Sequence, residues 1–133
     1  MRLLRSDAAP AIRDATTATS RLTARIQKSM QFIQAEFRRP LSVDALACQL
    51  AMSPSHYAHG FRAVAGVSPK RYVRDLRLNE ARVLLSGGAL RPSEVAAQVG
   101  FDSPEHFTRE FKRRFDATPT EYLRRMQRME CAP

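Results

Sequence analysis

Two short segments of the chain carry side chains suited to contact with a nucleic acid, and each segment directly follows a Ser-Pro pair. Arg109 is the strongest candidate for reading a base, because a guanidinium can pair with a guanine edge through two donors in one plane. Glu105 offers the acceptor that a cytosine amino group requires. Arg62 and Lys112 stand nearer the ends of their segments, which favours contacts with phosphate. The full candidate set is Ser55, Ala58, His59 and Arg62 in the first segment and Glu105, His106, Thr108, Arg109 and Lys112 in the second.

Four Ser-Pro or Thr-Pro pairs place these segments in the chain, at residues 53–54, 68–69, 103–104 and 118–119. Ser and Thr are good N-caps and Pro is tolerated at the first helical position, so each pair predicts the start of a helix. Pairs in the same half are 15 residues apart, and a shift of 50 residues brings His56 onto His106 and Phe61 onto Phe111. A repeat of two copies is too short for a solenoid and indicates twin small domains.

Each copy has the pattern of a helix, a tight turn and a second helix. In the first copy we expect helices over residues 43–50 and 54–65. In the second copy Gly100 stands where the end of a helix favours a left-handed residue. Aromatic residues at helical spacing form the inward face of each second helix, namely Tyr57 and Phe61 in the first copy and Phe107, Phe111 and Phe115 in the second. Core packing explains these residues, and the candidate residues occupy the opposite, outward faces.

Further helices complete each copy. Apolar residues from Ile26 to Phe37 recur at helical spacing, and this helix should end before Pro40. A long helix is expected over residues 69–85, and a final one begins at Pro119. The predicted fold is therefore all-α, with two homeodomain-like helix-turn-helix units joined by a long linker helix and about seven helices in all. We assign residues 1–22 to an N-terminal arm or linker, 23–68 to the first helix-turn-helix unit, 69–88 to the linker helix, and 89–133 to the second unit with the C-terminal helix.

The length of the linker helix sets an expected spacing between the two second helices. A helix of about 16 residues spans roughly 24 Å at 1.5 Å per residue. With one small bundle at each end, the second helices would lie about one duplex turn, roughly 34 Å, apart. We therefore expect that one chain can reach successive major grooves on one face of a DNA duplex.

Composition and charge agree with such a partner. The chain has 133 residues, with 22 basic against 13 acidic residues and a net charge of +9, which favours a polyanionic partner. No apolar run approaches the roughly 20 residues of a membrane helix or resembles a signal peptide, so no membrane partner is expected. Cys48 and Cys131 form neither a disulfide framework nor a zinc spacing. A reducing, cytoplasmic location is therefore expected.

Enzyme and metal-binding functions are less well supported. Cys48 is the only plausible nucleophile in the body of the chain, and its apolar helical pattern predicts a small buried residue. There are no suggestively spaced carboxylate pairs and no Gly-rich phosphate loop, so we expect no enzyme activity and no cofactor. Cys48, His56 and His59 match no known zinc pattern, and no metal is expected. The alternative is a protein-interaction module that acts through RNA polymerase or another partner without reading bases.

A combination of motifs over about residues 24–125 resembles the DNA-binding domain of AraC/XylS-type transcription regulators. The motifs are Leu46-Ala47, Ser53, Phe61 and Gly66-Val67-Ser68-Pro69, then Arg77-Leu78 and Ala81, then Val95-Ala96, Val99-Gly100-Phe101, Phe107, Phe111, Lys112 and Thr118-Pro119-Thr120-Glu121-Tyr122. The resemblance implies sequence-specific recognition of double-stranded promoter DNA by both second helices, a place at the nucleoid, and contact with RNA polymerase at many targets.

The chain departs from that family in two respects. His59 occupies a position where Arg is frequent, and Gly60 follows it. Gly inside a helix costs about 1 kcal/mol relative to Ala, so we expect this helix to be softer and less discriminating. Members of the family usually carry a separate sensing domain, and we expect it to be absent from a chain of 133 residues.

Overall fold

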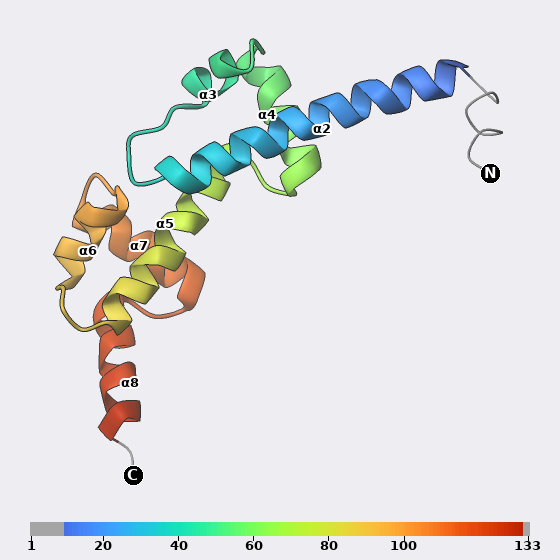
Figure 1. Cartoon of the computed structure of the whole chain (residues 1–133). Coiled ribbons are helices and arrows are strands. Elements are labelled where there is room, and N and C mark those ends of the chain that lie inside the picture. The colour runs from blue at the N-terminus through green and yellow to red at the C-terminus, as the bar shows by residue number, and fades with distance from the viewer. Residues whose placement is uncertain (1–9, 132–133) are drawn as a thin grey trace. The chain divides into compact units, whose positions relative to one another are not determined.

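The computed structural model describes the backbone of residues 10–131 and the side chains of residues 19–129. Over residues 10–131 it has seven α-helices and no strand, which confirms the predicted all-α fold (Figure 1). The helices are α2 (Pro10–Glu36), α3 (Val43–Gln49), α4 (Pro54–Ala65), α5 (Pro69–Ser86), α6 (Pro92–Val99), α7 (Pro104–Phe115) and α8 (Pro119–Cys131).

The helix starts follow from local capping chemistry. Helices α4, α5, α7 and α8 begin at the prolines of the four Ser-Pro and Thr-Pro pairs, as predicted. The Ser53 hydroxyl accepts a hydrogen bond from the backbone N–H of His56 at 3.1 Å, and Ser103 makes the equivalent bond to His106. Each bond satisfies a backbone donor that the first turn of a helix leaves without a partner.

The chain divides into two compact units, and the division falls inside α2. The first unit contains the described residues up to Ile33 together with Ser42–Pro69. The second contains Gln34–Leu41 together with the chain from Lys70 onward. The predicted linker helix, α5, thus belongs almost entirely to the second unit.

Helix α2 is longer than expected. Residues 10–22, which the sequence assigns to an arm or linker, continue the helix from Pro10, while residues 1–9 lie outside the described part of the chain. No Gly or Pro occurs between residues 11 and 37, so no residue in this stretch interrupts the helical backbone. The apolar period that predicts the helix begins at Ile26, which is buried, and Leu22 one turn earlier is partly buried.

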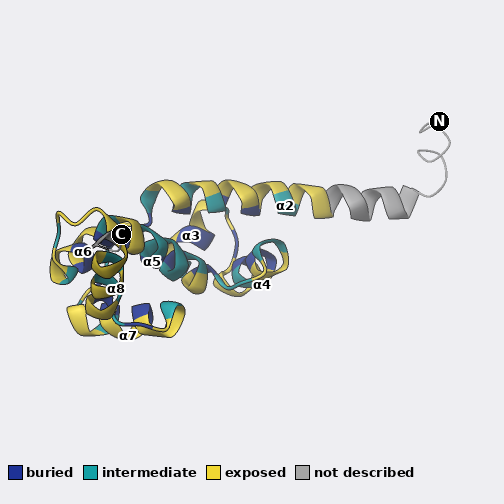
Figure 2. Cartoon of the chain, turned by 90° about the horizontal axis from the view of Figure 1, so that it is seen from below, coloured by how far each residue is buried: buried dark blue, intermediate teal, exposed yellow. Residues whose placement is uncertain are grey.

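The core of the first unit joins α2, α3 and α4. Its fully or nearly buried side chains are Ile26 and Ile33 from α2, Leu46 and Ala47 from α3, and Tyr57 and Phe61 from α4. Figure 2 shows the buried residues of α2 along one side of the helix. The Tyr57 hydroxyl and the Ser29 hydroxyl form a buried hydrogen bond of 2.7 Å. Burial raises the pKa of Tyr57, and its hydrogen bond with Ser29 opposes that rise.

The core of the second unit joins α5, α6 and α7. Its buried residues are Leu78, Ala81, Leu85, Val95, Ala96, Val99, Phe101, Phe107 and Phe111. The predicted inward residues Phe107 and Phe111 are buried, whereas Phe115 is partly buried. Three residues of α5 line this core, so the predicted linker helix forms one wall of the second helix-turn-helix unit.

The segment after α2 is attached to the second unit through Arg77. The Arg77 Nε donates to the Phe37 carbonyl oxygen at 2.7 Å, and its Nη2 donates to the Arg39 carbonyl oxygen at 2.9 Å. Gly100 ends α6 with a φ of +102°, as predicted. A Cβ at Gly100 would lie 2.8 Å from the Arg38 carbonyl oxygen, so glycine is required there for close packing as well as for its backbone conformation.

The prediction that Cys48 is a small buried residue is wrong. Cys48 is exposed, while its neighbours Leu46 and Ala47 are buried. Each residue along a helix adds a rotation of about 100°, so Cys48 lies about 200° around α3 from Leu46 and its side chain points away from the core.

Candidate nucleic-acid interface

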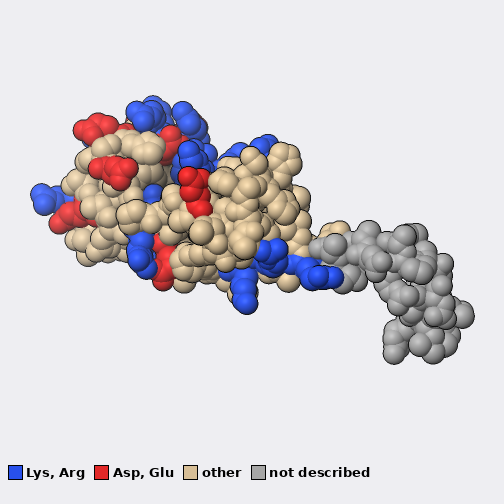
Figure 3. Space-filling view, turned by 90° about the horizontal axis from the view of Figure 1, so that it is seen from above, with Lys and Arg blue, Asp and Glu red and all other residues tan. Residues whose placement is uncertain are grey.

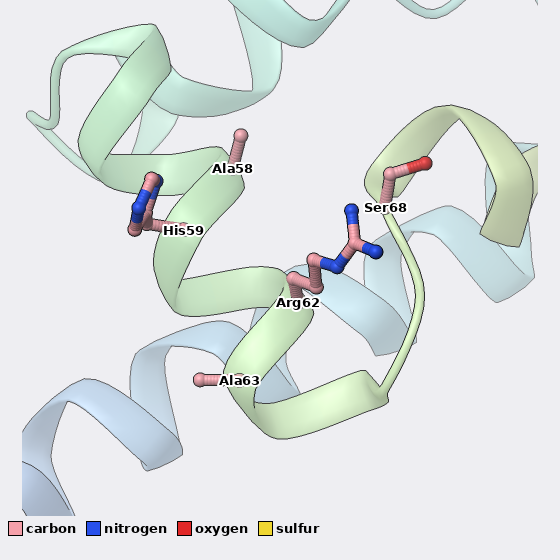
Figure 4. A pocket seen from close by; sticks show the side chains of 5 residues that line it. All are labelled: Ala58, His59, Arg62, Ala63 and Ser68. Carbon is pink, nitrogen blue, oxygen red and sulfur yellow. The ribbon is translucent and has the colours of Figure 1, made fainter.

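The outward face of α4 lies where the sequence places it. Ser55, His59 and Arg62 are exposed, Ala58 is partly exposed, and the aromatic residues of α4 are buried on the opposite face. This face borders an open hollow of about 410 Å³ that is lined by Ala58, His59, Arg62, Ala63 and Ser68. Figure 4 shows the Arg62 guanidinium extending across this hollow toward Ser68, just before α5. The guanidinium donors of Arg62 and several small side chains therefore share one accessible surface.

The outward face of α7 presents four exposed candidates, Glu105, Thr108, Arg109 and Lys112. They lie opposite the buried aromatic residues of α7, so they can contact a partner without disturbing the core. The last turn of α7 is strongly basic, because Lys112 is followed by Arg113 and Arg114. Cations near a helix C-terminus interact favourably with the helix dipole.

His106 differs from the other candidates of α7 because it packs against its own unit. Its ring lies edge-on to Phe101 with the centroids 5.4 Å apart, and its Nε2 lies 3.9 Å from Glu110 Oε2. The side chain is 45% exposed, so it lies at the rim of the outward face rather than at its centre.

Glu110 is a residue that the sequence reasoning missed. Its side chain is only 7% exposed, yet it is a carboxylate on the helix that carries the candidate readers. Arg74 Nη1 lies 3.4 Å from Glu110 Oε1, and Arg113 Nη1 lies 3.4 Å from Oε2. Glu110 Oε1 itself accepts no hydrogen bond from the described residues. Helical spacing alone predicts that Glu110 is buried. It stands three positions after Phe107, on the same face of α7, and directly precedes Phe111 in the sequence.

The ratio of basic to acidic residues differs between the two units. Residues 19–33 and 42–69 of the first unit carry four bases, Arg21, Arg25, Lys28 and Arg62, and a single acid, Asp44. The second unit carries 15 bases and 10 acids over residues 34–41 and 70–131. On the face in Figure 3, acidic and basic side chains lie close together over one part of the surface, whereas another part shows basic side chains only. The first unit therefore offers the more uniformly positive surface, and charge complementarity favours an anionic partner there.

Neither a metal cluster nor a membrane-spanning helix occurs in the described part of the chain. Among these residues, no group of three or more His, Cys, Asp or Glu side chains is placed to hold a metal ion. In the same part of the chain, no helix has both the length and the apolar character that crossing a membrane requires.

Comparison with known proteins identifies relatives of this chain. A family model described as a helix-turn-helix domain matches residues 46–125. The HTH-type transcriptional regulator GlxA of Rhizobium meliloti is 36% identical over 96 residues, which cover 72% of this chain and 30% of that protein. The chain thus spans about a third of the length of the curated relatives that it matches.

Solved structures agree with the fold. The C-terminal domain of AraT, a response regulator from Geobacillus stearothermophilus, aligns with a TM-score of 0.72 and 26% identity over 76% of this chain and 84% of that domain. The DNA-binding domain of AdpA, solved in complex with a target DNA, aligns with a TM-score of 0.76 over 81% of this chain and 97% of that domain. Its identity to this chain is 22%, so that likeness concerns the fold alone.

Proposed function

The chain belongs to the AraC/XylS family of helix-turn-helix proteins, and from this premise we propose that it is a sequence-specific DNA-binding regulator of transcription. The observation that carries the proposal is that α4 and α7 are amphipathic, with one buried and one accessible face each. Tyr57 and Phe61 of α4 and Phe107 and Phe111 of α7 are buried, and the exposed candidates lie on the opposite face of each helix. We propose that α4 and α7 are the recognition helices and enter successive major grooves of promoter DNA.

Each candidate residue receives a role from its chemistry and its place on the helix. On α7 we propose that Arg109 pairs with a guanine edge, that Glu105 accepts from a cytosine, and that Thr108 contacts a neighbouring base. Lys112 contacts a phosphate. His106 supports the rim of this surface through its packing against Phe101.

On α4, the exposed side chains are smaller and less basic. We propose that Ser55 and His59 contact base edges, that Ala58 makes apolar contact, and that Arg62 binds a phosphate. The contrast with α7 supports a division in which the second unit supplies more of the base discrimination. The single acid among the described residues of the first unit means that few carboxylates there oppose the approach of a duplex.

The wider setting of this activity follows from the family. We propose that the protein acts in the cytoplasm at the nucleoid and contacts RNA polymerase at the promoters that it regulates. We also retain the proposed functional division into an arm (1–22), a first unit (23–68), a linker helix (69–88) and a second unit (89–133). Because the aligned segment covers only about a third of the matched relatives, the activity of a whole regulator is part of this proposal.

Selection of bound sites from a random duplex library tests the proposal directly. The protein should enrich one sequence, and its binding to that sequence should survive an excess of random DNA. A module that acts only through protein partners would bind DNA weakly and enrich no sequence, and that result would overturn the proposal.

The selected site then allows a test of single residues. Arg109→Ala should cost roughly 1–3 kcal/mol on the selected site and relax the preference at one base pair. Lys112→Ala should weaken binding about equally on all sequences and reduce the salt slope by about 0.9. Arg128→Ala, which removes an exposed charge from α8, is the matched control. If Arg109→Ala lowered affinity uniformly without relaxing any position, its role as a reader would be wrong.

A further inference from the structure

A second hollow of the first unit lies between α2 and the beginning of α4. It has a volume of about 410 Å³ and is lined by Thr19, Arg21, Leu22, Arg25 and His56. We propose that this hollow binds a phosphate of the DNA backbone beside the groove that α4 enters. The inference rests on the proposed function and adds to it a contact made by α2, outside the helix-turn-helix itself.

The lining has the donors that a phosphate requires. Arg21 and Arg25 are four residues apart, so their side chains lie on the same face of α2, one turn from each other. Thr19 contributes a hydroxyl, and the His56 imidazole carries an N–H donor in either protonation state. A guanidinium fork matches the geometry of phosphate oxygens and forms strong charge-assisted hydrogen bonds with them.

One of the two arginines is already held in place. The Arg25 Nη2 donates a hydrogen bond to the carbonyl oxygen of Leu50, the C-cap residue of α3. A guanidinium has five N–H donors, so this bond leaves others to face the hollow. Fixing the side chain in advance lowers the conformational entropy that phosphate binding would otherwise cost.

The surrounding charge favours an anion. Asp44 is the one acid in residues 19–33 and 42–69, against four bases. Lys28 is exposed and stands seven residues after Arg21, so it extends the same basic face of α2 by a further turn. A phosphate that approaches α2 therefore meets little competition from carboxylates of these segments.

The position of the hollow identifies the source of the phosphate. His56 lies in the first turn of α4, directly after the proposed base contact Ser55. Recognition helices of helix-turn-helix proteins read bases with their N-terminal residues, and the groove at that end is bordered by the sugar-phosphate backbone. A phosphate on that border would lie beside the first turn of α4, where the hollow opens. Such a contact would fix the orientation of α4 on the duplex without reading sequence.

The decisive variant is Arg21→Ala, because Arg21 has no part in the bond that ties α2 to α3. On the selected site we expect a loss of affinity of roughly three- to tenfold, equal on matched and single-substituted sequences. The salt slope should fall by about 0.9, so that raising the salt from 50 to 200 mM weakens the variant about 3.5-fold less than the wild type. Arg21→Lys should retain most of the affinity, and Arg128→Ala should change it less than about twofold.

A scan with single methylphosphonate substitutions locates the contact on the DNA. Each substitution removes the charge of one phosphate, and at one position it should weaken the wild type clearly more than Arg21→Ala, which has already lost one contact to that phosphate. The melting temperature of Arg21→Ala should equal that of the wild type. If Arg21→Ala behaves like Arg128→Ala and every phosphate position affects both proteins alike, the phosphate site is refuted, although the wild type still selects a sequence. If the wild type selects no sequence, the proposed function itself fails.

Discussion

Gly60 lies inside α4 on the face that packs against α2, and we expect its replacement by alanine to raise the stability of the first unit. The residue is buried, and it is not among the glycines with a positive φ. A Cβ at this position would lie 3.4 Å from Leu22 Cδ1, 3.6 Å from Leu22 Cδ2 and 3.5 Å from Ile26 Cδ1. These are ordinary van der Waals distances to the flexible ends of two side chains, so the methyl group has room.

The expected magnitude has two parts. Alanine is favoured over glycine in a helix interior by about 1 kcal/mol. Burying one methyl group contributes up to about 0.8 kcal/mol more, reduced by any shift that Leu22 must make. We therefore expect a gain of about 1–2 kcal/mol. For a protein of this size, each kcal/mol corresponds to a rise of about 3–5 °C in the melting temperature of the unit.

Thermal unfolding followed by circular dichroism measures this gain, and amide hydrogen exchange assigns it to α4. Gly66→Ala is the matched control, since it adds the same methyl group at the end of the same helix. Gly66 has a φ of +84° and no heavy atom within 4 Å of the added Cβ. Its substitution should cost about 1–2 kcal/mol through backbone conformation alone.

Two results would refute this reasoning. A lower melting temperature for Gly60→Ala, with faster exchange of α4 amides, would mean that the contact between α2 and α4 cannot accept a methyl group. An unchanged melting temperature for Gly66→Ala would mean that the left-handed backbone at the C-cap of α4 imposes no energetic cost on a residue with a Cβ. If Gly60 also softens the recognition helix, Gly60→Ala should sharpen base preference at the half-site bound by α4.

Three further predictions concern stability and charge. Glu110→Gln should change the free energy of unfolding by less than about 1 kcal/mol, because ion pairing and desolvation nearly offset each other, and should strengthen binding to random duplex DNA in anisotropy titrations. Tyr57→Phe should cost about 1–2 kcal/mol in urea unfolding, since it leaves the buried Ser29 hydroxyl without its partner. The pKa values of Glu94 and Glu121 are lowered from 4.5, chiefly by hydrogen bonds from the backbone N–H groups of Arg91 and Thr118. A depressed folded-state pKa contributes stability that is present above about pH 4.5 and lost as the pH falls through the folded value, so acid unfolding of the Glu94→Gln and Glu121→Gln variants should show a weaker pH dependence there.

The sequence by itself determined where α4, α5, α7 and α8 begin, the repeat, and the inward and outward faces of α4 and α7. The helix starts and the helix faces depend on chemistry within a few residues, and the repeat is found by comparing two stretches of the sequence directly. A Ser or Thr side chain caps the N–H groups of the next turn, as Ser53 and Ser103 do, and a proline fits the first helical position. Aromatic residues one turn apart must share a face, so helical spacing alone assigns Phe107 and Phe111 to the core, where both are buried.

The tertiary structure alone decided which segments belong together. The Arg77 side chain joins the end of α2 to the second unit through the carbonyl oxygens of Phe37 and Arg39, about 40 residues away in the chain. The wall that α5 contributes to the second core likewise depends on which helices pack against α5. The local sequence pattern predicts which face of a helix is buried, but it does not predict which other helix packs against that face.

The same distinction applies to the candidate site. The exposed residues of α4 and α7 follow from helical period, whereas the hollow between Arg21 and His56 joins positions 35 residues apart that share no sequence signal. Glu110 lies between these two cases. Its position in the helical period of α7 predicts that it is buried, but its ion-pair partner Arg74 comes from another helix and could not be predicted from the local sequence. Contacts between distant segments form only where the whole core fixes two helices side by side, and their free energy depends on that packing rather than on either segment alone.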